Sequence, residues 1–289
     1  MAKIKRDFYF IGFGNMAQAI YQRMDKKSYK NIFLIEKSDQ RIKEIKDMSE
    51  NFPYLGNFKI SPQTQIIKKL SKSKLSRFDT ILLAVKPAQI KSVCGQLKPL
   101  AKEQPLIISI AAGVNSLKIK QYLGGYSGHK FVRAMPNLCA KKAMAITGLF
   151  GDSDWYGKKG RTVYGQEVNK IFTSIGQVLW VVEESDLDSV TAISGSGPAY
   201  IYYIMNAMID TAEEIGLKRS DAQRLVAQTI IGAGETGKDI DNLESEIIKV
   251  SSKGGTTEKA INVFKQKKLD AIIKRAVKAA HKRSKELSK

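Results

Sequence analysis

Short apolar runs alternate with polar, helix-forming stretches through the first 182 residues of the chain. Most of these runs are apolar without a break, as strands buried on both faces of a sheet are. Strands that alternate with helices in this way predict a parallel sheet covered by helices. The predicted strands are Phe8 to Gly12, Ile32 to Glu36, Thr80 to Val85, Leu106 to Ala111, Lys130 to Ala134, Ala145 to Phe150 and Gln177 to Val182.

After Glu183 the apolar positions follow a helical period instead. Apolar residues recur every three or four positions over 198–216, and Gly216 is placed to end that helix. The pattern therefore predicts an α/β domain over residues 1–182 and an all-helical domain over residues 183–289. A last amphipathic helix is predicted from Leu269, Ile272, Ile273, Ala276 and Ala280.

Composition excludes several classes of protein. With 43% apolar and 26% charged residues, the chain is neither disordered nor fibrous. The apolar stretch over 189–209 contains a Ser-Gly-Ser-Gly-Pro run that would leave backbone groups unpaired in lipid, so we expect no membrane partner. The apolar run that follows the basic start stops at Gly12, too early for a secretory signal. We therefore expect a cytoplasmic protein.

Cysteine and histidine are too sparse and too scattered for a metal centre or a disulfide framework. We expect no bound metal and a reducing compartment. The chain has two residues of each type, namely Cys94, Cys139, His129 and His281.

The net charge of +20 is concentrated in residues 1–150, which hold 27 basic and 9 acidic residues. The lysines are spread along the sequence and are not interleaved with aromatic residues, as they often are in nucleic-acid-binding segments. We expect a lysine-rich solvated surface that attracts anionic cofactors and substrates, and no nucleic-acid partner. A basic protein that senses dinucleotides or binds nucleic acid is the non-enzymatic alternative.

A glycine-rich turn follows the first predicted strand and precedes a helix. In a GxGxxA turn the first glycine makes the bend, the second lets a pyrophosphate approach the backbone, and the alanine allows close helix packing. This context predicts a Rossmann-type dinucleotide-binding domain; the alternative is a glycine turn in an unrelated α/β protein. The predicted cofactor-binding residues of the turn are Gly12, Phe13, Gly14, Asn15, Met16 and Ala17.

Glu36 ends the second predicted strand, where Rossmann domains contact the ribose nearest the adenine. Its carboxylate would accept hydrogen bonds from ribose hydroxyls and repel a 2′-phosphate, whereas Lys37 and Arg41 would attract one. The residues conflict, so the cofactor is NADPH or NADH, and Glu36 favours NADH. The alternative for Glu36 is a solvated strand end.

Two further segments close predicted strands and are placed to contact the nicotinamide end of the cofactor, because strand carboxyl ends line the ligand crevice of such sheets. Each segment alone is also compatible with a purely structural turn. The predicted cofactor-binding residues here are Ala84, Val85, Lys86 and Pro87 in the first segment, and Pro136 and Asn137 in the second.

The segment Ser251 to Thr257 opens a helix and contains two adjacent glycines. Consecutive backbone N–H groups, hydroxyl donors and the positive end of a helix together form a receptor for a small anion such as a carboxylate. The alternative is a glycine-rich helix start capped by Thr256. The predicted substrate-binding residues are Ser252, Gly254, Gly255, Thr256 and Thr257.

Taken in order along nearly the whole chain, these segments resemble the pyrroline-5-carboxylate reductase family. The most specific matches are the SGSGPAY run at 194–200 and the SSKGGTT run at 251–257. The resemblance implies a Rossmann domain followed by an all-α dimerisation domain, a homodimer or higher oligomer, and reduction of 1-pyrroline-5-carboxylate to proline by NADPH or NADH. This sequence departs from the family pattern at Lys253, at Leu138-Cys139 and at Glu36-Lys37.

The implied mechanism needs no acid–base pair, because a protonated imine is already electrophilic and only has to be held against the nicotinamide. The substrate carboxylate would rest on the backbone N–H groups of Gly255, Thr256 and Thr257. The Thr257 hydroxyl would contact the ring nitrogen, which makes it the candidate catalytic residue, and we expect the reaction at the cleft between the domains. Another two-domain NAD(P)-dependent imine or hydroxy-acid reductase is the enzymatic alternative.

The apolar stripe of the 198–216 helix, widened by Tyr202 and Tyr203, is more than one small helical domain would cover. A subunit interface explains this surface, and a monomeric core is the alternative.

Overall fold

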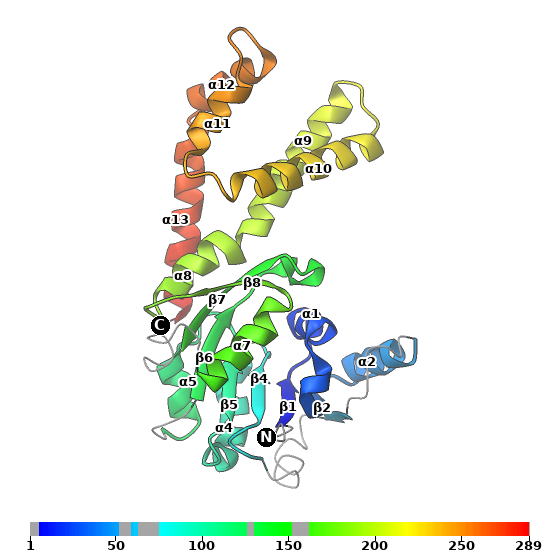
Figure 1. Ribbon diagram of the computed structural model, residues 1–289, viewed down its shortest axis with the longest axis vertical. Coiled ribbons are helices and arrows are strands. Elements are labelled where there is room, and N and C mark those ends of the chain that lie inside the picture. Colours follow the sequence, from blue (N-terminus) through cyan, green and yellow to red (C-terminus); the bar gives the residue numbers. More distant parts are fainter. Residues whose placement is uncertain (1–5, 52–58, 63–74, 126–129, 152–161, 289) are drawn as a thin grey trace. The chain divides into compact units, whose positions relative to one another are not determined.

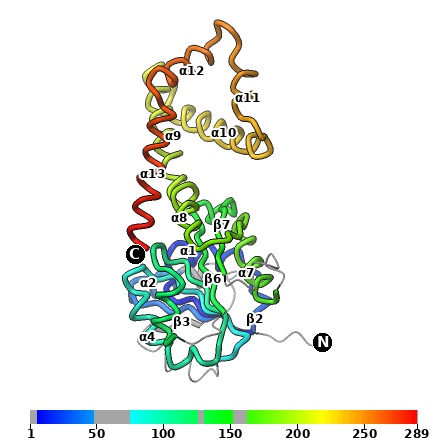
Figure 2. Tube along the Cα trace, turned by 90° about the vertical axis from the view of Figure 1, so that its left-hand side faces the viewer, coloured from blue at the N-terminus to red at the C-terminus, as the bar shows by residue number. Residues whose placement is uncertain are grey.

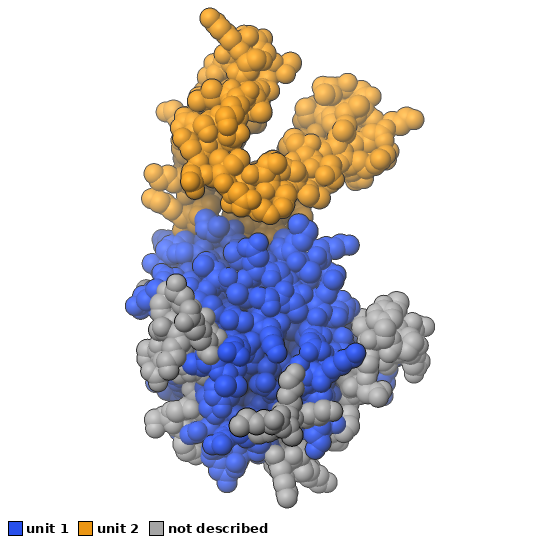
Figure 3. Space-filling model, in the orientation of Figure 1, with its two compact units in different colours: residues 1–195, 281–289 blue, residues 196–280 orange. Residues whose placement is uncertain are grey.

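The computed structural model describes residues 6–51, 59–62, 75–125, 130–151 and 162–288. The chain divides into two compact units, one formed by residues 1–195 and 281–289 and the other by residues 196–280 (Figure 3). The boundary after Gly195 differs from the predicted one after Val182. The physical reason is α8 (Asp186–Val190), whose Leu187 and Val190 side chains still pack on the sheet against Gly148.

Within the described residues the first unit contains an eight-stranded sheet with the order β3-β2-β1-β4-β5-β6-β7-β8 (Figure 1). All seven predicted strands are present. The additional strand, β3, has only four residues and ends in proline, so it carries no apolar run that could have predicted it. The strands are β1 (Arg6–Ile11), β2 (Tyr29–Glu36), β3 (Lys59–Pro62), β4 (Thr80–Leu83), β5 (Leu106–Ser109), β6 (Lys130–Met135), β7 (Ala145–Gly151) and β8 (Gly176–Trp180).

The predicted parallel pairing is present from β3 through β6, but the last two strands run the other way. β7 runs antiparallel to β6, and β8 is parallel to β7. The connection between β6 and β7 holds only the short helix η5 (Leu138–Lys142), whereas a parallel crossover needs about a dozen residues or more. Between β7 and β8 the chain contains α7 (Val163–Thr173), which gives room for a parallel crossover.

Successive side chains of β1 point to opposite faces of the sheet, and this alternation explains why there is one hydrophobic core on each face. Phe8 and Phe10 pack into a core with α1 (Asn15–Arg23) and α7, while Tyr9 and Ile11 pack into a second core with α4 (Ile90–Ala101) and α5 (Ser116–Tyr122). Both faces of the central strands are thereby covered, so the ligand site is left to the edge formed by the strand ends. The remaining bounds in this unit are η1 (Lys26–Ser28), α2 (Asp39–Asn51), η4 (Pro87–Gln89), α4 (Ile90–Ala101), α5 (Ser116–Tyr122) and the π-helix η6 (Thr191–Gly195).

The second unit is helical, as predicted. Gly216 adopts a φ of +102° just beyond the end of α9 (Gly197–Glu214), and α10 (Arg219–Gly237) folds back against α9 after it (Figure 1). The last predicted helix is also present and extends into the first unit from His281 onward. The helices are α9 (Gly197–Glu214), α10 (Arg219–Gly237), α11 (Leu243–Val250), α12 (Thr256–Gln266) and α13 (Leu269–Ser288).

The second unit covers little of its apolar surface. Among the described residues its buried core consists of Ile209, Ala222 and Val226. Tyr203 remains 81% exposed and Ile248 68% exposed. Side chains of these types are usually mostly buried. None of the helices in the described ranges combines the length and the apolar character that a membrane span requires.

Candidate active site

A cavity of about 490 Å³ opens at the carboxyl ends of β1, β2 and β4. This volume lies within the range of roughly 300–1,000 Å³ that is typical of small-molecule pockets. Twelve of the fourteen predicted cofactor residues come together around it. They are Gly12, Phe13, Gly14, Asn15, Met16, Ala17, Glu36, Lys37, Ala84, Val85, Lys86 and Pro87.

Gly12 can only be glycine, for two independent reasons. Its φ is +85°, and a Cβ at this position would lie 2.8 Å from both the carbonyl oxygen of Ala84 and Cγ1 of Val85. Its N–H donates to the carbonyl of Ile35 across 2.8 Å, which ties the turn to β2. The first glycine of the motif is therefore required by the protein itself.

Gly14 differs, because a Cβ there would meet no protein atom within 4 Å. The residue is the N-cap of α1; no side chain caps the helix, and the first turn carries no acidic residue. The first-turn N–H groups and the positive end of the helix thus face open space. This arrangement fits the pyrophosphate of a dinucleotide.

The Glu36 carboxylate is held by three backbone N–H groups. Oε2 accepts from Phe13 across 2.8 Å, and Oε1 accepts from Lys37 across 2.7 Å and from Ser38 across 3.2 Å. A carboxylate has about four acceptor sites, so one remains for a ligand hydroxyl. Glu36 is therefore more than a solvated strand end, because it lines the pocket and buttresses the glycine turn. Arg41 approaches the same turn through a 3.3 Å bond from Nε to the carbonyl of Phe13.

Pro136 and Asn137 do not line the cavity. The Asn137 side chain is buried and occupied: its Nδ2 donates to Oγ and to the carbonyl of Ser194, and its Oδ1 accepts from the N–H of Cys139. Its amide therefore serves to fasten the π-helix η6 to the end of β6. Other residues line the pocket that were not predicted from the sequence, namely Gln89, Ile110, Ala111, Ala112 and Leu138. The strand-end rule that selected Val85 would have selected the end of β5 as well.

The second predicted site lies in the other unit, between α11 and α12. In this structure the N–H of Gly255, which is expected to receive a carboxylate, donates to the carbonyl of Ser252 across 2.9 Å. The N–H of Gly254 is likewise occupied by Oε2 of Glu258 at 2.8 Å. Gly255 is the N-cap of α12, so Thr256 does not cap the helix and both threonines lie in its first turn. Their N–H groups need no intrahelical partner.

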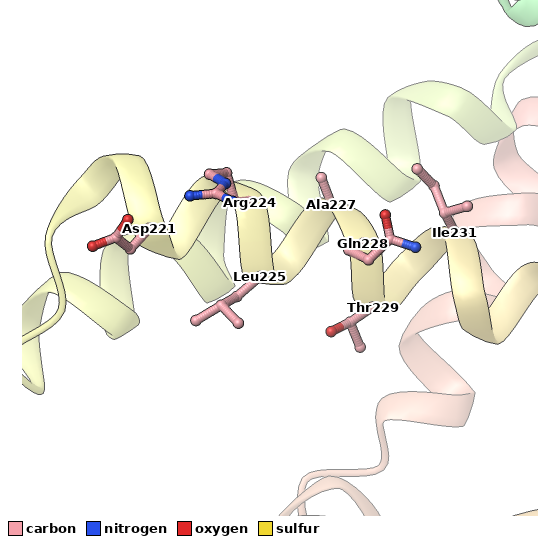
Figure 4. Close-up of a pocket in the computed structure, with 7 residues that line it drawn as sticks. All are labelled: Asp221, Arg224, Leu225, Ala227, Gln228, Thr229 and Ile231. Carbon is pink, nitrogen blue, oxygen red and sulfur yellow. The ribbon is translucent and has the colours of Figure 1, made fainter.

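A larger hollow of about 650 Å³ lies over α10 (Figure 4). All the residues that line it belong to this one helix, so it is a groove over a helix face and not a converging ligand pocket. The lining residues are Asp221, Arg224, Leu225, Ala227, Gln228, Thr229 and Ile231. In the part of the chain that the structure describes, no three His, Cys, Asp or Glu side chains cluster as metal ligands.

Fold and pocket together define a dinucleotide-binding protein of the Rossmann class joined to a helical unit with an uncovered apolar surface. A family model described as NADP oxidoreductase, coenzyme F420-dependent, matches residues 7–113. A second model, described as pyrroline-5-carboxylate reductase dimerisation, matches residues 184–287. The start of this second match lies close to the predicted domain boundary.

The chain belongs to the pyrroline-5-carboxylate reductase family. It is 33% identical to the pyrroline-5-carboxylate reductase of Pasteurella multocida over 97% of each chain. Among solved structures, the enzyme of Coxiella burnetii is 33% identical with a TM-score of 0.80, covering 99% of each chain. The enzyme of Plasmodium falciparum, solved with NADP bound, is 26% identical with a TM-score of 0.77 over 99% of each chain.

The two glycines of the turn predict different outcomes on substitution. Gly14→Ala is expected to weaken NAD(P)H binding at least about tenfold, or about 1.4 kcal/mol, with little change in melting temperature. Gly12→Ala is expected to lower both the affinity for NAD(P)H and the melting temperature, because its Cβ would collide with the backbone of Ala84. Fluorescence titration of NAD(P)H and thermal melts measure this. Wild-type affinity in Gly14→Ala would show that no ligand occupies the open space beside Gly14.

Proposed function

We propose that this protein reduces 1-pyrroline-5-carboxylate to L-proline with NADPH or NADH, the last step of proline biosynthesis. The observation that carries the proposal is similarity to reductases of this name over nearly the whole chain, which includes both the dinucleotide pocket and the loop at 251–257. The reaction consumes the imine, one NAD(P)H and one proton, and yields proline and NAD(P)⁺.

The cofactor, when bound, supplies the hydride, and the chain supplies position and charge. Gly12 and the first turn of α1 hold the pyrophosphate, and Val85 with the neighbouring end of β4 forms the wall beside the nicotinamide. The N–H groups of Thr256 and Thr257 receive the substrate carboxylate, assisted by the Ser252 hydroxyl and the positive end of α12. The Thr257 hydroxyl accepts a hydrogen bond from the protonated imine nitrogen and orients the ring.

Self-association follows from the uncovered helical surface. The dimerisation model covers residues 184–287, and the apolar side chains left exposed in the second unit need a partner. We propose a homodimer, or a higher oligomer built from dimers, without a nucleic-acid or membrane partner. We place the enzyme in the cytoplasm, where Cys94 and Cys139 would remain reduced.

The direct test is consumption of NADH or NADPH in the presence of 1-pyrroline-5-carboxylate, followed by near-ultraviolet absorbance with proline quantified in parallel. We expect oxidation of the cofactor and an equal amount of proline. A hydroxy-acid substrate in place of the imine serves as the control and is expected to give no turnover. Absence of turnover with both cofactors would overturn the proposal.

Glu36→Gln is expected to raise the preference for NADPH over NADH, measured as the ratio of the two kcat/KM values, by roughly tenfold. The substitution keeps one acceptor oxygen for the N–H groups of Lys37 and Ser38, gives up the bond from Phe13, and removes the charge that repels a 2′-phosphate. Lys37→Gln is the matched control at the same strand end and is expected to shift the ratio toward NADH. An unchanged ratio in Glu36→Gln would mean that Glu36 does not reach the ribose.

Thr257→Ala is expected to lower kcat/KM for the imine about ten- to a hundredfold. The variant keeps the backbone donors and loses one hydrogen bond to a charged group, worth roughly 1.5–3 kcal/mol. Thr256→Ala, with the same change one residue away, is expected to have a much smaller effect. Cofactor affinity, measured by fluorescence titration, should not change in either variant. Full activity in Thr257→Ala would show that Thr257 has only a structural role at the start of α12.

A further inference from the structure

The segment that connects β5 to α5 forms one wall of the dinucleotide pocket through Ile110, Ala111 and Ala112. Because β4 and β5 follow β1 on the side opposite β2, this wall lies across the glycine turn from Glu36. Glu36 marks the adenosine end of the pocket. The segment therefore borders the nicotinamide half of the pocket.

The next residue of this segment is backed by the C-terminal end of α13. Gly113 has a φ of +72°, and a Cβ there would lie 2.9 Å from Cβ of Leu287 and 3.0 Å from its carbonyl oxygen. Nδ2 of Asn115 also donates to the carbonyl of Ser288, at 3.5 Å. The last turn of α13 is thus in direct contact with the segment one residue beyond the pocket wall.

Asp188 on α8 anchors this end of the helix. Its Oδ1 accepts from Oγ of Ser284 across 2.6 Å and from Oγ of Ser288 across 3.3 Å. Ser284 is only 7% exposed, unlike most residues of α13. Figures 1 and 2 both place the end of α13 beside α8.

A second carboxylate just before α8 fastens the far end of the segment. The carboxylate of Glu184 accepts from both the N–H and Oγ of Ser116, each at 2.6 Å. Arg133 on β6 holds the same carboxylate at 2.8 Å, and its side chain is only 9% exposed. Residues 113–116 are therefore held at both ends by contacts outside the pocket, while residues 110–112 line the dinucleotide pocket.

We propose that the C-terminal turns of α13, anchored on Asp188, are a positioning element for the nicotinamide side of the pocket. Asp188 and Ser284 are positioning residues that act through Leu287 and Gly113, without touching the cofactor. The inference rests on the proposed function, because it requires a dinucleotide in the cavity. Its signature is loss of affinity for the nicotinamide half with retention of affinity for the adenosine half.

The test compares binding of NADH and of ADP, which is NADH without its nicotinamide half, by isothermal titration calorimetry. Asp188→Ala and the milder Ser284→Ala are expected to weaken NADH binding about three- to tenfold and leave ADP binding unchanged. Asp188→Asn keeps an acceptor oxygen and is expected to restore most of the NADH affinity. Glu286→Ala alters the same turn at an exposed ion pair with Arg283 and should bind both ligands like the wild type.

Hydrogen exchange of the amides over 110–116 provides a second readout, and it is expected to accelerate in Asp188→Ala and Ser284→Ala. Equal weakening of NADH and ADP binding, or unchanged binding of both, would overturn the inference while the proposed function stands. A wild-type protein that binds ADP but no NAD(P)H would instead overturn the proposed function, and the inference with it.

Discussion

The parallel pairing of β1 between β2 and β4 is the constraint on which the rest of the site depends. At the end of β1, the N–H of Gly12 is bonded to Ile35 on one side, and the carbonyl of Ile11 accepts from Ala84 on the other, both at 2.8 Å. These two backbone hydrogen bonds hold the ends of β1, β2 and β4 next to one another at one edge of the sheet. The glycine turn, the acidic strand end and the wall at Ala84–Pro87 converge there because of chain direction alone.

In the function proposed above, the residues that hold the cofactor and those that hold the substrate belong to different compact units. The dinucleotide pocket belongs to the first, where Gly14 leaves open space beside a helix N-terminus. The loop proposed to bind the substrate carboxylate belongs to the second, where Thr256 and Thr257 begin another helix. In the proposed mechanism each half relies on backbone N–H groups and helix ends. An imine that is already protonated requires positioning more than acid–base assistance.

Local patterns predicted much of this structure. Continuous apolar runs such as 106–109 identify buried strands, and the spacing from Gly12 to Glu36 identifies the pocket, because both depend on neighbouring residues. Features that depend on tertiary pairing were not predictable. The direction of β7 follows from a short connection that holds η5, and β3 is too short to show a pattern.

The same limit applies within the site. The N–H of Gly255 turns inward to Ser252, and the amide of Asn137 is occupied by Ser194. Neither partner is apparent from spacing. The contact of Leu287 with Gly113 joins residues that are far apart in the sequence, so only the folded chain shows that the C-terminal turns back the pocket wall.

Transfer of deuterium tests the central claim most directly. The protein would be incubated with 1-pyrroline-5-carboxylate and NAD(P)H carrying deuterium at both C4 positions of the nicotinamide, and the proline would be examined by mass spectrometry and NMR. The account predicts proline with a single deuterium on the ring carbon that was the imine carbon. Proline without deuterium, or oxidation of the cofactor without proline, would contradict it.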